Sequence, residues 1–474
     1  MAAKNIYLIG IKGVGMTMLA QFLACQGNRI SGSDVSESFL TDKVLADVGI
    51  KVSSPFSADN LPQETDLVIY SSAFTAKNNP ELAALAKLPA TKRPKMLSYA
   101  EALGEEFSAK KGIAVCGSHG KTTVSAWLGY VLWKSVKKPS VLVGSRVPQF
   151  KGSSLSGRSD IFVAETDEYQ NKLQYFQPYG VVLNNIDYDH PDFFKTEADY
   201  VKVFADFLKK IPERGFLVMN NRDADSRRIS KYCRGRIAKY DVADEDYSGE
   251  TVNYLAHSVK LKSGNQYFHI NNLGEFKIRL LGRHNIFNAL AVVAAARELG
   301  VPLKKIKEHL FDFTGTERRA EFLGNYRGAM IIDDYAHHPT EIKTTIAGVK
   351  ARYPKQRLRV IFHPHTFTRT KALFTDFTKS FADAQELVVL DIYGSAREKQ
   401  GGVSSLQLIK AIEKVNKQAN RQQQISNVKD IEAAIKYLRA SVKPGDIILL
   451  MGAGDVFRVG QELLKNYHDF KKRK

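Results

Sequence analysis

Short apolar runs alternate with polar or amphipathic stretches along most of this chain. Near the beginning, strand-like runs cover 5–10, 28–33 and 66–71, and residues 16–26 have the apolar spacing of a helix. Strands that alternate with helices in this way favour βαβ units around a parallel sheet. The pattern therefore predicts an α/β domain in the first hundred residues.

A second series of strands and helices follows a polar stretch, Glu105–Gly112, that we interpret as a linker. It begins with an apolar run at 113–116, a glycine-rich loop and an amphipathic helix that ends near Lys134. The later elements predicted in this part are strands at 160–165, 180–184 and 215–219, a polar β-rich insert at about 236–281 and a buried helix at 285–298. This series predicts a second α/β domain.

A third change of pattern occurs at 313–322, around Gly315. Beyond it, four strands separated by helices are predicted at 329–333, 358–363, 386–391 and 446–451. The expected fold is therefore α/β with three domains, at residues 1–108, 109–316 and 317–474.

Composition narrows the class of protein. Hydrophobic residues make up 44% of the 474 residues and charged residues 25%, which is typical of globular domains rather than disordered chains. No apolar run is long enough to span a bilayer, and because no secretory signal is visible before the first strand we expect none. Three widely spaced cysteines form neither a disulfide framework nor a metal-binding pattern. We expect a cytoplasmic protein.

The formal net charge of +19 is compatible with nucleic acid, an anionic membrane surface or polyanionic small substrates. The basic residues are dispersed and do not interleave with aromatic residues as in single-strand-binding proteins. Phosphate-bearing substrates are therefore the better interpretation. A nucleic-acid-binding ATPase remains an alternative.

The strongest local motif is a glycine-rich loop between a strand and a helix. It consists of Gly117, Ser118, His119, Gly120, Lys121, Thr122 and Thr123. Backbone N–H groups of such a loop cradle phosphates, while the lysine reaches the β- and γ-phosphates and the threonine hydroxyl holds Mg²⁺. Val115 stands where the full pattern has glycine, so this is a shortened variant; an ordinary glycine-rich turn is the alternative.

Acidic residues follow two later strands. Glu165–Glu168 comes directly after one strand, and the run 184–190, which ends in His190, comes after the next. Carboxylates at strand ends beside a phosphate loop are candidate Mg²⁺ ligands, and His190 is a candidate second ligand. The alternatives are a solvated acidic loop and an unliganded polar histidine.

The first loop, with Gly10, Gly13 and Gly15, also joins a strand to a helix. Its spacing is G-x-x-G-x-G rather than the dinucleotide G-x-G-x-x-G. Asp34 ends the next strand, where a carboxylate can meet a ribose hydroxyl. A nucleotide diphosphate is the expected ligand; a nicotinamide-dependent oxidoreductase and a ligand-free turn are the alternatives.

Two dense polar clusters follow strands in the last third, at 333–341 and 363–370. Clusters at adjacent strand ends of an open α/β sheet predict a single site. Their histidine spacings match no zinc pattern.

These motifs, in their order along the chain, resemble those of the Mur ligases, the ATP-dependent amino-acid ligases of peptidoglycan synthesis. The motifs are GIKGVGM at 10–16, SGSD at 31–34, SSA at 71–73, GSHGKTT at 117–123, ETDEY at 165–169, NNIDYDH at 184–190, GRHNIFN at 282–288, TGTERR at 314–319, DDYAHHPTE at 333–341, HPHTFTRT at 363–370 and MGAGD at 451–455. The resemblance implies an N-terminal Rossmann-like UDP-binding domain, a central P-loop ATPase domain with the β-rich insert, and a C-terminal Rossmann-like domain.

The resemblance also implies roles for individual residues. UDP-sugar contacts are expected from Gly10, Gly13, Gly15, Asp34, Ser71 and Ser72. ATP contacts are expected from residues 117–123, Asn288, Arg319 and Asp334, and metal ligands from Thr122, Glu165 and His190. The amino-acid side is expected to comprise His337, His338, His365 and Arg369, with Arg369 on the incoming carboxylate. Lys121, Glu165, His190 and Arg319 are the expected catalytic residues. His190 or His337 is expected to titrate near the working pH and to accept the proton of the amine.

The implied activity is an ATP- and Mg²⁺-dependent ligase that joins L-alanine to the lactyl carboxylate of UDP-N-acetylmuramate through an acyl phosphate. Nucleic acid and membrane are not expected partners, and a monomer or homodimer is expected. The stretch 183–194 instead resembles the ligase that attaches an intact L-Ala-γ-D-Glu-diaminopimelate tripeptide to the same sugar, whereas 363–370 and DIYGSARE at 391–398 resemble the alanine-adding enzyme. A non-catalytic homologue is a third alternative, against which the intact Lys121, Glu165 and His190 argue.

Overall fold

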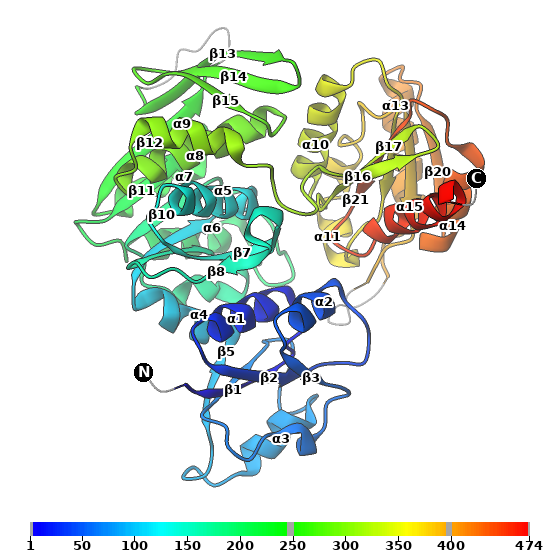
Figure 1. The fold of residues 1–474 in the computed structure, drawn as a ribbon. Coiled ribbons are helices and arrows are strands. Elements are labelled where there is room, and N and C mark those ends of the chain that lie inside the picture. The colour runs from blue at the N-terminus through cyan, green and yellow to red at the C-terminus, as the bar shows by residue number, and fades with distance from the viewer. Residues whose placement is uncertain (1–2, 244–250, 395–400, 473–474) are drawn as a thin grey trace.

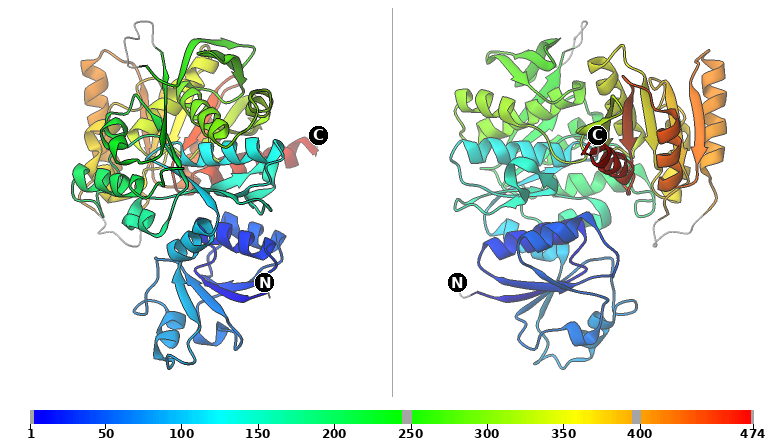
Figure 2. Two further views of the ribbon diagram at one scale, coloured as in Figure 1. Left: turned by 90° about the vertical axis from the view of Figure 1, so that its left-hand side faces the viewer. Right: turned by 45° about the vertical axis from the view of Figure 1, so that its right-hand side comes forward.

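The computed structural model describes residues 3–243, 251–394 and 401–472, and they form three lobes along the chain (Figure 1). Each lobe contains one mainly parallel sheet. The N-terminal lobe stands apart from the other two, and helix α1 (Val14–Cys25) lies at its boundary with the middle lobe (Figure 2). The predicted three-domain α/β fold is confirmed.

The N-terminal lobe has a five-stranded parallel sheet in the order β3-β2-β1-β4-β5. Besides α1, its elements are β1 (Asn5–Ile9), β2 (Arg29–Ser33), α2 (Leu40–Asp47), β3 (Lys51–Ser53), η1 (Ala58–Asn60), β4 (Leu67–Tyr70), α3 (Pro80–Lys87), β5 (Lys95–Ser98) and α4 (Tyr99–Ser108). The linker predicted at 105–112 is wrong, because α4 continues to Ser108 and the next strand begins at Lys111. The polar residues there include the outer face of α4, whose inner face buries Leu103 and Phe107.

The middle lobe has a ten-stranded sheet in the order β15-β14-β13-β12-β11-β10-β6-β9-β7-β8. Its elements are β6 (Lys111–Cys116), α5 (Lys121–Lys134), β7 (Ser140–Val147), η2 (Pro148–Phe150), β8 (Gly152–Leu155), β9 (Ile161–Glu165), η3 (Tyr169–Tyr175), β10 (Gly180–Leu183), α6 (Glu197–Leu208), β11 (Phe216–Asn220), α7 (Ala224–Ile229), η4 (Ser230–Tyr232), β12 (Arg236–Val242), β13 (Tyr254–Lys262), β14 (Asn265–Ile270), β15 (Gly274–Ile278), α8 (Arg283–Glu298) and α9 (Leu303–Asp312).

Two predictions for the middle lobe have different outcomes. The β-rich insert is confirmed: β13 continues the sheet parallel to β12, and β14 and β15 follow as antiparallel neighbours, although 244–250 of the predicted insert lies outside the described residues. The amphipathic character predicted for α5 is wrong. Residues 122–132 are all buried, because α5 packs between the sheet and helices α8 and α9.

The C-terminal lobe has a six-stranded sheet in the order β16-β17-β21-β18-β19-β20. Its elements are β16 (Glu321–Tyr326), β17 (Ala329–Asp334), α10 (Pro339–Arg352), β18 (Leu358–Phe362), α11 (Phe367–Ala372), α12 (Phe374–Phe377), β19 (Glu386–Leu390), α13 (Ser405–Gln418), β20 (Gln424–Val428), α14 (Ile431–Ser441), β21 (Ile447–Met451) and α15 (Phe457–Lys472). The four predicted strands are present, but the prediction missed β16 and β20. Both are partly exposed edge strands, so they lack the apolar run of a buried parallel strand.

The sheets of the middle and C-terminal lobes direct strand ends toward a common interface. The loops after β6, β9 and β10 belong to the middle lobe, and those after β17 and β18 belong to the C-terminal lobe. Side chains from these loops contact one another, as described below. Ligand sites of open α/β sheets form at the carboxyl ends of strands. None of the helices that the structure describes is both long and apolar enough to span a membrane.

Candidate active site

The phosphate loop connects β6 to α5 and has no room for side chains at two of its glycines. Gly117 has φ +119°, and a Cβ there would lie 2.6 Å from the Asn185 carbonyl oxygen. Gly120 has φ +78°, and a Cβ there would lie 2.7 Å from Asn288 Oδ1. The backbone therefore forms an uncovered cradle at the start of α5, which fits a phosphate group.

Lys121 is held inside this loop. Its Nζ donates hydrogen bonds to the Gly117 carbonyl at 2.5 Å and to Glu168 Oε2 at 3.2 Å. Glu168 is itself buried and accepts a hydrogen bond from Tyr200 at 2.8 Å. Burial by itself lowers the pKa of Lys121, but Glu168 and Asp167 outweigh it, and the pKa lies above its ordinary value. Lys121 therefore stays positively charged beside the cradle.

Thr122, Glu165 and Arg319 form a second group next to Lys121. The Thr122 hydroxyl donates to Glu165 Oε1 at 2.8 Å, and the Gly144 N–H donates to Glu165 Oε2 at 2.6 Å. Arg319, from the start of the C-terminal lobe, donates from Nη2 to Thr122 Oγ1 at 3.4 Å. A hydroxyl and a carboxylate are hard oxygen donors, so this pair fits Mg²⁺.

His190 lies in a different group of side chains. Its ligand atom and those of Asp167 and Glu168 all lie within 4.8 Å of one another, and its ring lies 4.6 Å from that of Tyr169. The structure thus places His190 with Asp167 and Glu168, and Thr122 with Glu165. The sequence identifies Asp167 and Glu168 only as part of an acidic run and does not place them with His190.

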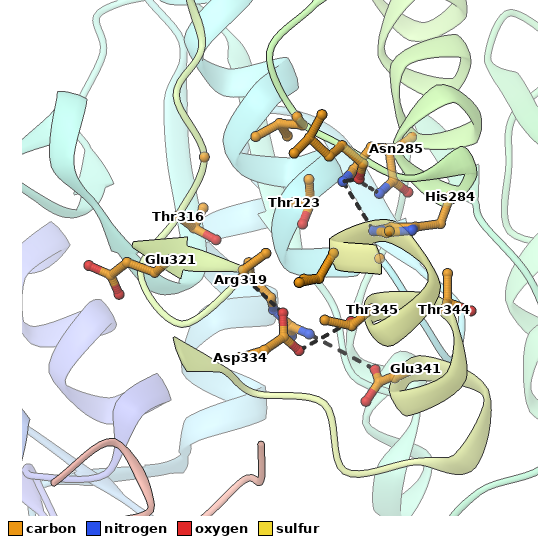
Figure 3. Close-up of a pocket in the computed structure, with 18 of the residues that line it drawn as sticks. Thr123, His284, Asn285, Thr316, Arg319, Glu321, Asp334, Glu341, Thr344 and Thr345 are labelled. Carbon is orange, nitrogen blue, oxygen red and sulfur yellow. Dashed lines mark hydrogen bonds and ion pairs between the residues drawn. The ribbon is translucent and has the colours of Figure 1, made fainter. Parts of the chain in front are cut away.

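A cavity of about 730 Å³ opens between the phosphate loop, α8 and the C-terminal lobe (Figure 3). Six residues predicted from the sequence line it: His119, Gly120, Thr123, Asn288, Arg319 and Asp334. Figure 3 shows Arg319, Asp334 and Glu341 together, with His284 and Asn285 on the other side of the cavity. His284, Asn285 and Glu341 stand inside quoted motifs but had no assigned role. The volume and the polar lining are suited to a nucleotide.

His119 connects the phosphate loop to the C-terminal lobe. Its Nε2 lies 2.9 Å from Asp187 Oδ2, and its Nδ1 lies 3.2 Å from Glu341 Oε1. Burial alone lowers the pKa of His119, but these two carboxylates outweigh it and raise that pKa to about 9. The imidazolium therefore forms an ionic contact between the two lobes at neutral pH.

Asp334 ends β17 and is bound by backbone groups. Its carboxylate accepts hydrogen bonds from the N–H groups of Ala320 at 2.7 Å and Ala336 at 2.8 Å. Burial raises the pKa of Asp334 to about 6. The residue thus fixes the loop that carries Arg319 as well as lining the cavity.

On the predicted amino-acid side, Arg369 pairs with Asp189 of the middle lobe. Arg369 Nε lies 3.1 Å from Asp189 Oδ1, and Nη2 lies 3.3 Å from Oδ2. Burial and the nearby Arg369 lower the pKa of His337 to about 3. The expectation that His337 titrates near the working pH is therefore wrong. Its Nδ1–H donates to the Tyr335 carbonyl at 3.1 Å, which leaves Nε2 as a hydrogen-bond acceptor.

His338 and His365 have other surroundings. His338 is the N-cap of α10, where its Nδ1 accepts a hydrogen bond from the Thr340 N–H at 3.3 Å. Burial and the neighbouring His119 lower the pKa of His338. The ring of His365 stacks on Tyr393 with a centroid distance of 5.7 Å.

The first glycine-rich loop is shaped by close packing. A Cβ on Gly10, which has φ +82°, would lie 2.7 Å from the Phe74 ring. Asp34 accepts hydrogen bonds from the N–H groups of Lys12 at 2.6 Å and Val35 at 2.8 Å. Its carboxylate therefore joins the ends of two neighbouring strands.

The rest of this predicted UDP site lies around the same loop. Gly13 begins α1 as its N-cap, and a Cβ there would have only ordinary contacts. Ser71 packs near Gly10, and Ser72 is exposed. A Cβ on Gly15 would lie 2.8 Å from the ring of Tyr99, a residue that no local motif had indicated. Burial raises the pKa of Tyr99, with Glu165 and Asp167 contributing.

Comparison with known families gives three consecutive matches. They are described as "Mur ligase family, catalytic domain" at residues 5–111, "Mur ligase middle domain" at 115–296, and "Mur ligase, glutamate ligase domain" at 318–454.

Similar proteins are found along the full length. A UDP-N-acetylmuramate–L-alanine ligase of Desulfitobacterium hafniense is 38% identical, covering 97% of this chain and 99% of the relative. One from Caldanaerobacter subterraneus is 35% identical, covering 98% and 97%. Among solved structures, UDP-N-acetylmuramate-alanine ligase MurC of Thermotoga maritima superposes with a TM-score of 0.81 at 24% identity, covering 98% and 99%. A murein peptide ligase of Psychrobacter arcticus gives 0.71 at 23%, covering 98% of both chains. At such identities the structural likeness concerns the fold alone.

Proposed function

The chain belongs to the Mur ligase family, and we propose that it joins L-alanine to the lactyl carboxylate of UDP-N-acetylmuramate in an ATP- and Mg²⁺-dependent reaction. The choice of L-alanine is supported by relatives that are named for this activity and are 35–38% identical over nearly the whole chain. The geometric observation that carries the proposal is the contact of Arg319 with Thr122, which brings the C-terminal lobe onto the phosphate loop.

ATP would bind with its phosphates on the loop 117–123 and its nucleoside in the cavity beside Asn288. Thr122 and Glu165 would hold one Mg²⁺, and His190, which is grouped with Asp167 and Glu168, would hold a second; the ions would neutralise phosphate charge when bound. Asp334 would keep the C-terminal wall of the cavity in place.

The first chemical step would transfer the γ-phosphoryl group. A lactyl carboxylate oxygen attacks the γ-phosphorus, and the bond between the γ-phosphorus and the β-phosphate oxygen breaks. The products of this step are ADP and an acyl phosphate. Lys121 and Arg319 would stabilise the negative charge on the phosphoryl oxygens from two sides. Because these residues belong to different lobes, the arrangement is complete only when the lobes meet.

The second step would form the amide. The amine nitrogen attacks the acyl carbon, a tetrahedral intermediate forms, inorganic phosphate leaves, and the amine loses its proton. Arg369 would bind the carboxylate of the amino acid, with His338 and His365 nearby. His337, neutral above about pH 3, would accept a hydrogen bond through Nε2. Because His190 is assigned above to a metal ion, the amine proton would pass to the leaving phosphate or to solvent.

The UDP part of the sugar nucleotide would bind at the first glycine-rich loop. Gly10, Gly13 and Gly15 would approach its diphosphate, and Asp34, Ser71 and Ser72 would surround the nucleoside. We also propose the domain boundaries 1–108, 109–316 and 317–474, a cytoplasmic location, and a monomer or homodimer.

Phosphate release tests the proposal. The purified chain is mixed with ATP, Mg²⁺ and UDP-N-acetylmuramate, and either L-alanine or the L-Ala-γ-D-Glu-diaminopimelate tripeptide is added. Release that requires L-alanine supports the proposed activity. Release with the tripeptide only would make the chain a ligase for that peptide, and no release with either would overturn the substrate assignment.

A further inference from the structure

Resting on the function proposed above, we infer that Asp189 is a positioning residue that holds the guanidinium of Arg369 in place for the α-carboxylate of the incoming amino acid. Asp189 belongs to the loop after β10 in the middle lobe, and Arg369 belongs to α11 in the C-terminal lobe. The proposed binding site for the amino acid is thereby divided between two lobes.

The two side chains meet in a geometry that uses one edge of the guanidinium. Nε of Arg369 faces Asp189 Oδ1 at 3.1 Å, and Nη2 faces Oδ2 at 3.3 Å. A guanidinium has five N–H donors in a fixed planar fork. The pair with Asp189 occupies two of them, and the edge formed by Nη1 and the second hydrogen of Nη2 remains. That edge matches a second carboxylate bidentately.

Asp189 is itself fixed. Its Oδ1 also accepts a hydrogen bond from the His190 N–H at 2.7 Å, and His190 has a left-handed backbone with φ +57°. Both Asp189 and Arg369 are buried, with 8% and 7% of their surface exposed. Two hydrogen bonds from Arg369 and one from a backbone N–H thus fix the orientation of the Asp189 carboxylate.

Contacts beside this pair join the same two lobes. Thr340 Oγ1 donates to Asp187 Oδ2 at 2.7 Å, and His119 reaches Glu341. An amino acid would therefore encounter an oriented Arg369 only when the middle and C-terminal lobes have met. This arrangement makes amino-acid recognition depend on the same closure that brings Arg319 to Thr122.

Asp189→Asn tests the inference, because asparagine keeps the shape and removes the charge. KM values for L-alanine, ATP and UDP-N-acetylmuramate are measured in the wild-type chain and the variant. We expect the KM for L-alanine to rise at least tenfold, while the other two KM values change less than threefold. Thr340→Ala is the matched control, since it removes a contact between the same lobes and leaves Arg369 paired.

A second readout separates positioning from a structural effect. L-Alaninamide has the amine of L-alanine but no carboxylate, so the ratio of kcat/KM for the two amines reports carboxylate recognition. Asp189→Asn should lower this ratio at least fivefold, and Thr340→Ala should leave it unchanged. Arg369→Lys, which keeps the ion pair but has no second edge, should lower it too. If Asp189→Asn does not fold, Arg369→Lys still tests whether this site recognises the carboxylate.

The outcomes distinguish this inference from the proposed function. An active wild-type chain in which Asp189→Asn leaves the ratio unchanged, or raises all three KM values equally, overturns the positioning role alone. A wild-type chain that releases no phosphate with L-alanine overturns the proposed function and this inference with it.

Discussion

Arg319 Nη2 lies 3.4 Å from Thr122 Oγ1, although 197 residues separate them in the chain. The contact joins the start of the C-terminal lobe to the first turn of α5. Thr122 in turn donates to Glu165, so a cation, a hydroxyl and a carboxylate follow one another across the boundary between the lobes. This is the arrangement expected where a phosphoryl group is bound from both sides.

Neighbouring arginines should respond differently to truncation. Arg319→Ala should reduce kcat/KM for ATP about 100-fold or more with little loss of stability, because its partly exposed side chain serves the cavity. Arg318 instead pairs with the buried Asp333 at 2.9 Å and donates to the Gly452 carbonyl at 2.7 Å. Arg318→Ala should therefore destabilise the fold by about 3–5 kcal/mol. Thermal unfolding and steady-state kinetics on both variants check the contrast, and equal stability losses would contradict it.

Lys121→Ala should lower ATP turnover at least about 100-fold without unfolding the chain, because the loop backbone is shaped by its glycines while Lys121 supplies the charge. The variant leaves Glu168 buried without its cation, so some loss of stability is expected as well. Lys134→Ala, at an exposed position at the other end of α5, is the matched control and should leave turnover unchanged. Near-normal turnover in folded Lys121→Ala, measured as ADP formation, would rule out this phosphate site.

Gly120→Ala should weaken ATP binding at least tenfold, about 1.4 kcal/mol. The new Cβ would lie 2.7 Å from Asn288 Oδ1 and would force the loop or the cavity wall to move. Gly27 also has positive φ, at +90°, but nothing lies within 4 Å of its added Cβ. Gly27→Ala should cost only about 1–2 kcal/mol of backbone strain and leave ATP binding unchanged. Calorimetric titration with ATP compares the two; similar affinities would count against the cradle.

The ionic contact of His119 predicts a pH dependence of stability. A pKa raised from 6.5 to about 9 means that the stabilisation is complete below pH 6.5 and is lost as pH rises through 9. At about 1.4 kcal/mol for each pH unit, its size is on the order of 3 kcal/mol. The melting temperature of wild type should exceed that of His119→Gln most at pH 6 and least near pH 10. His257→Gln, at an exposed site on β13, should follow wild type throughout. A difference that grows with pH would refute the ionic contact.

The sequence by itself determined the fold class, the three domains and most strands, because buried parallel strands need continuous apolar runs that are visible locally. It also located the glycine-rich turn between β6 and α5, since Gly117 and Gly120 have conformations that favour glycine and stand in fixed order with Lys121 and Thr122. Predictions about individual elements were wrong where the surroundings of the element decide its structure. The inner face of α4 and the complete burial of α5 depend on what packs against them.

Only the tertiary structure decided how charged groups are paired. One motif supplied Asp189 and His190 and others supplied Arg369 and Asp167, but the Arg369–Asp189 pair and the grouping of His190 with Asp167 arise from lobes and loops that meet in space. The same holds for His337, whose low pKa follows from burial and a neighbouring guanidinium that lies 32 positions further along the chain. The type of a residue determines which charges its side chain can carry. Which charge it carries is set by desolvation and by neighbours that the linear sequence does not place beside it.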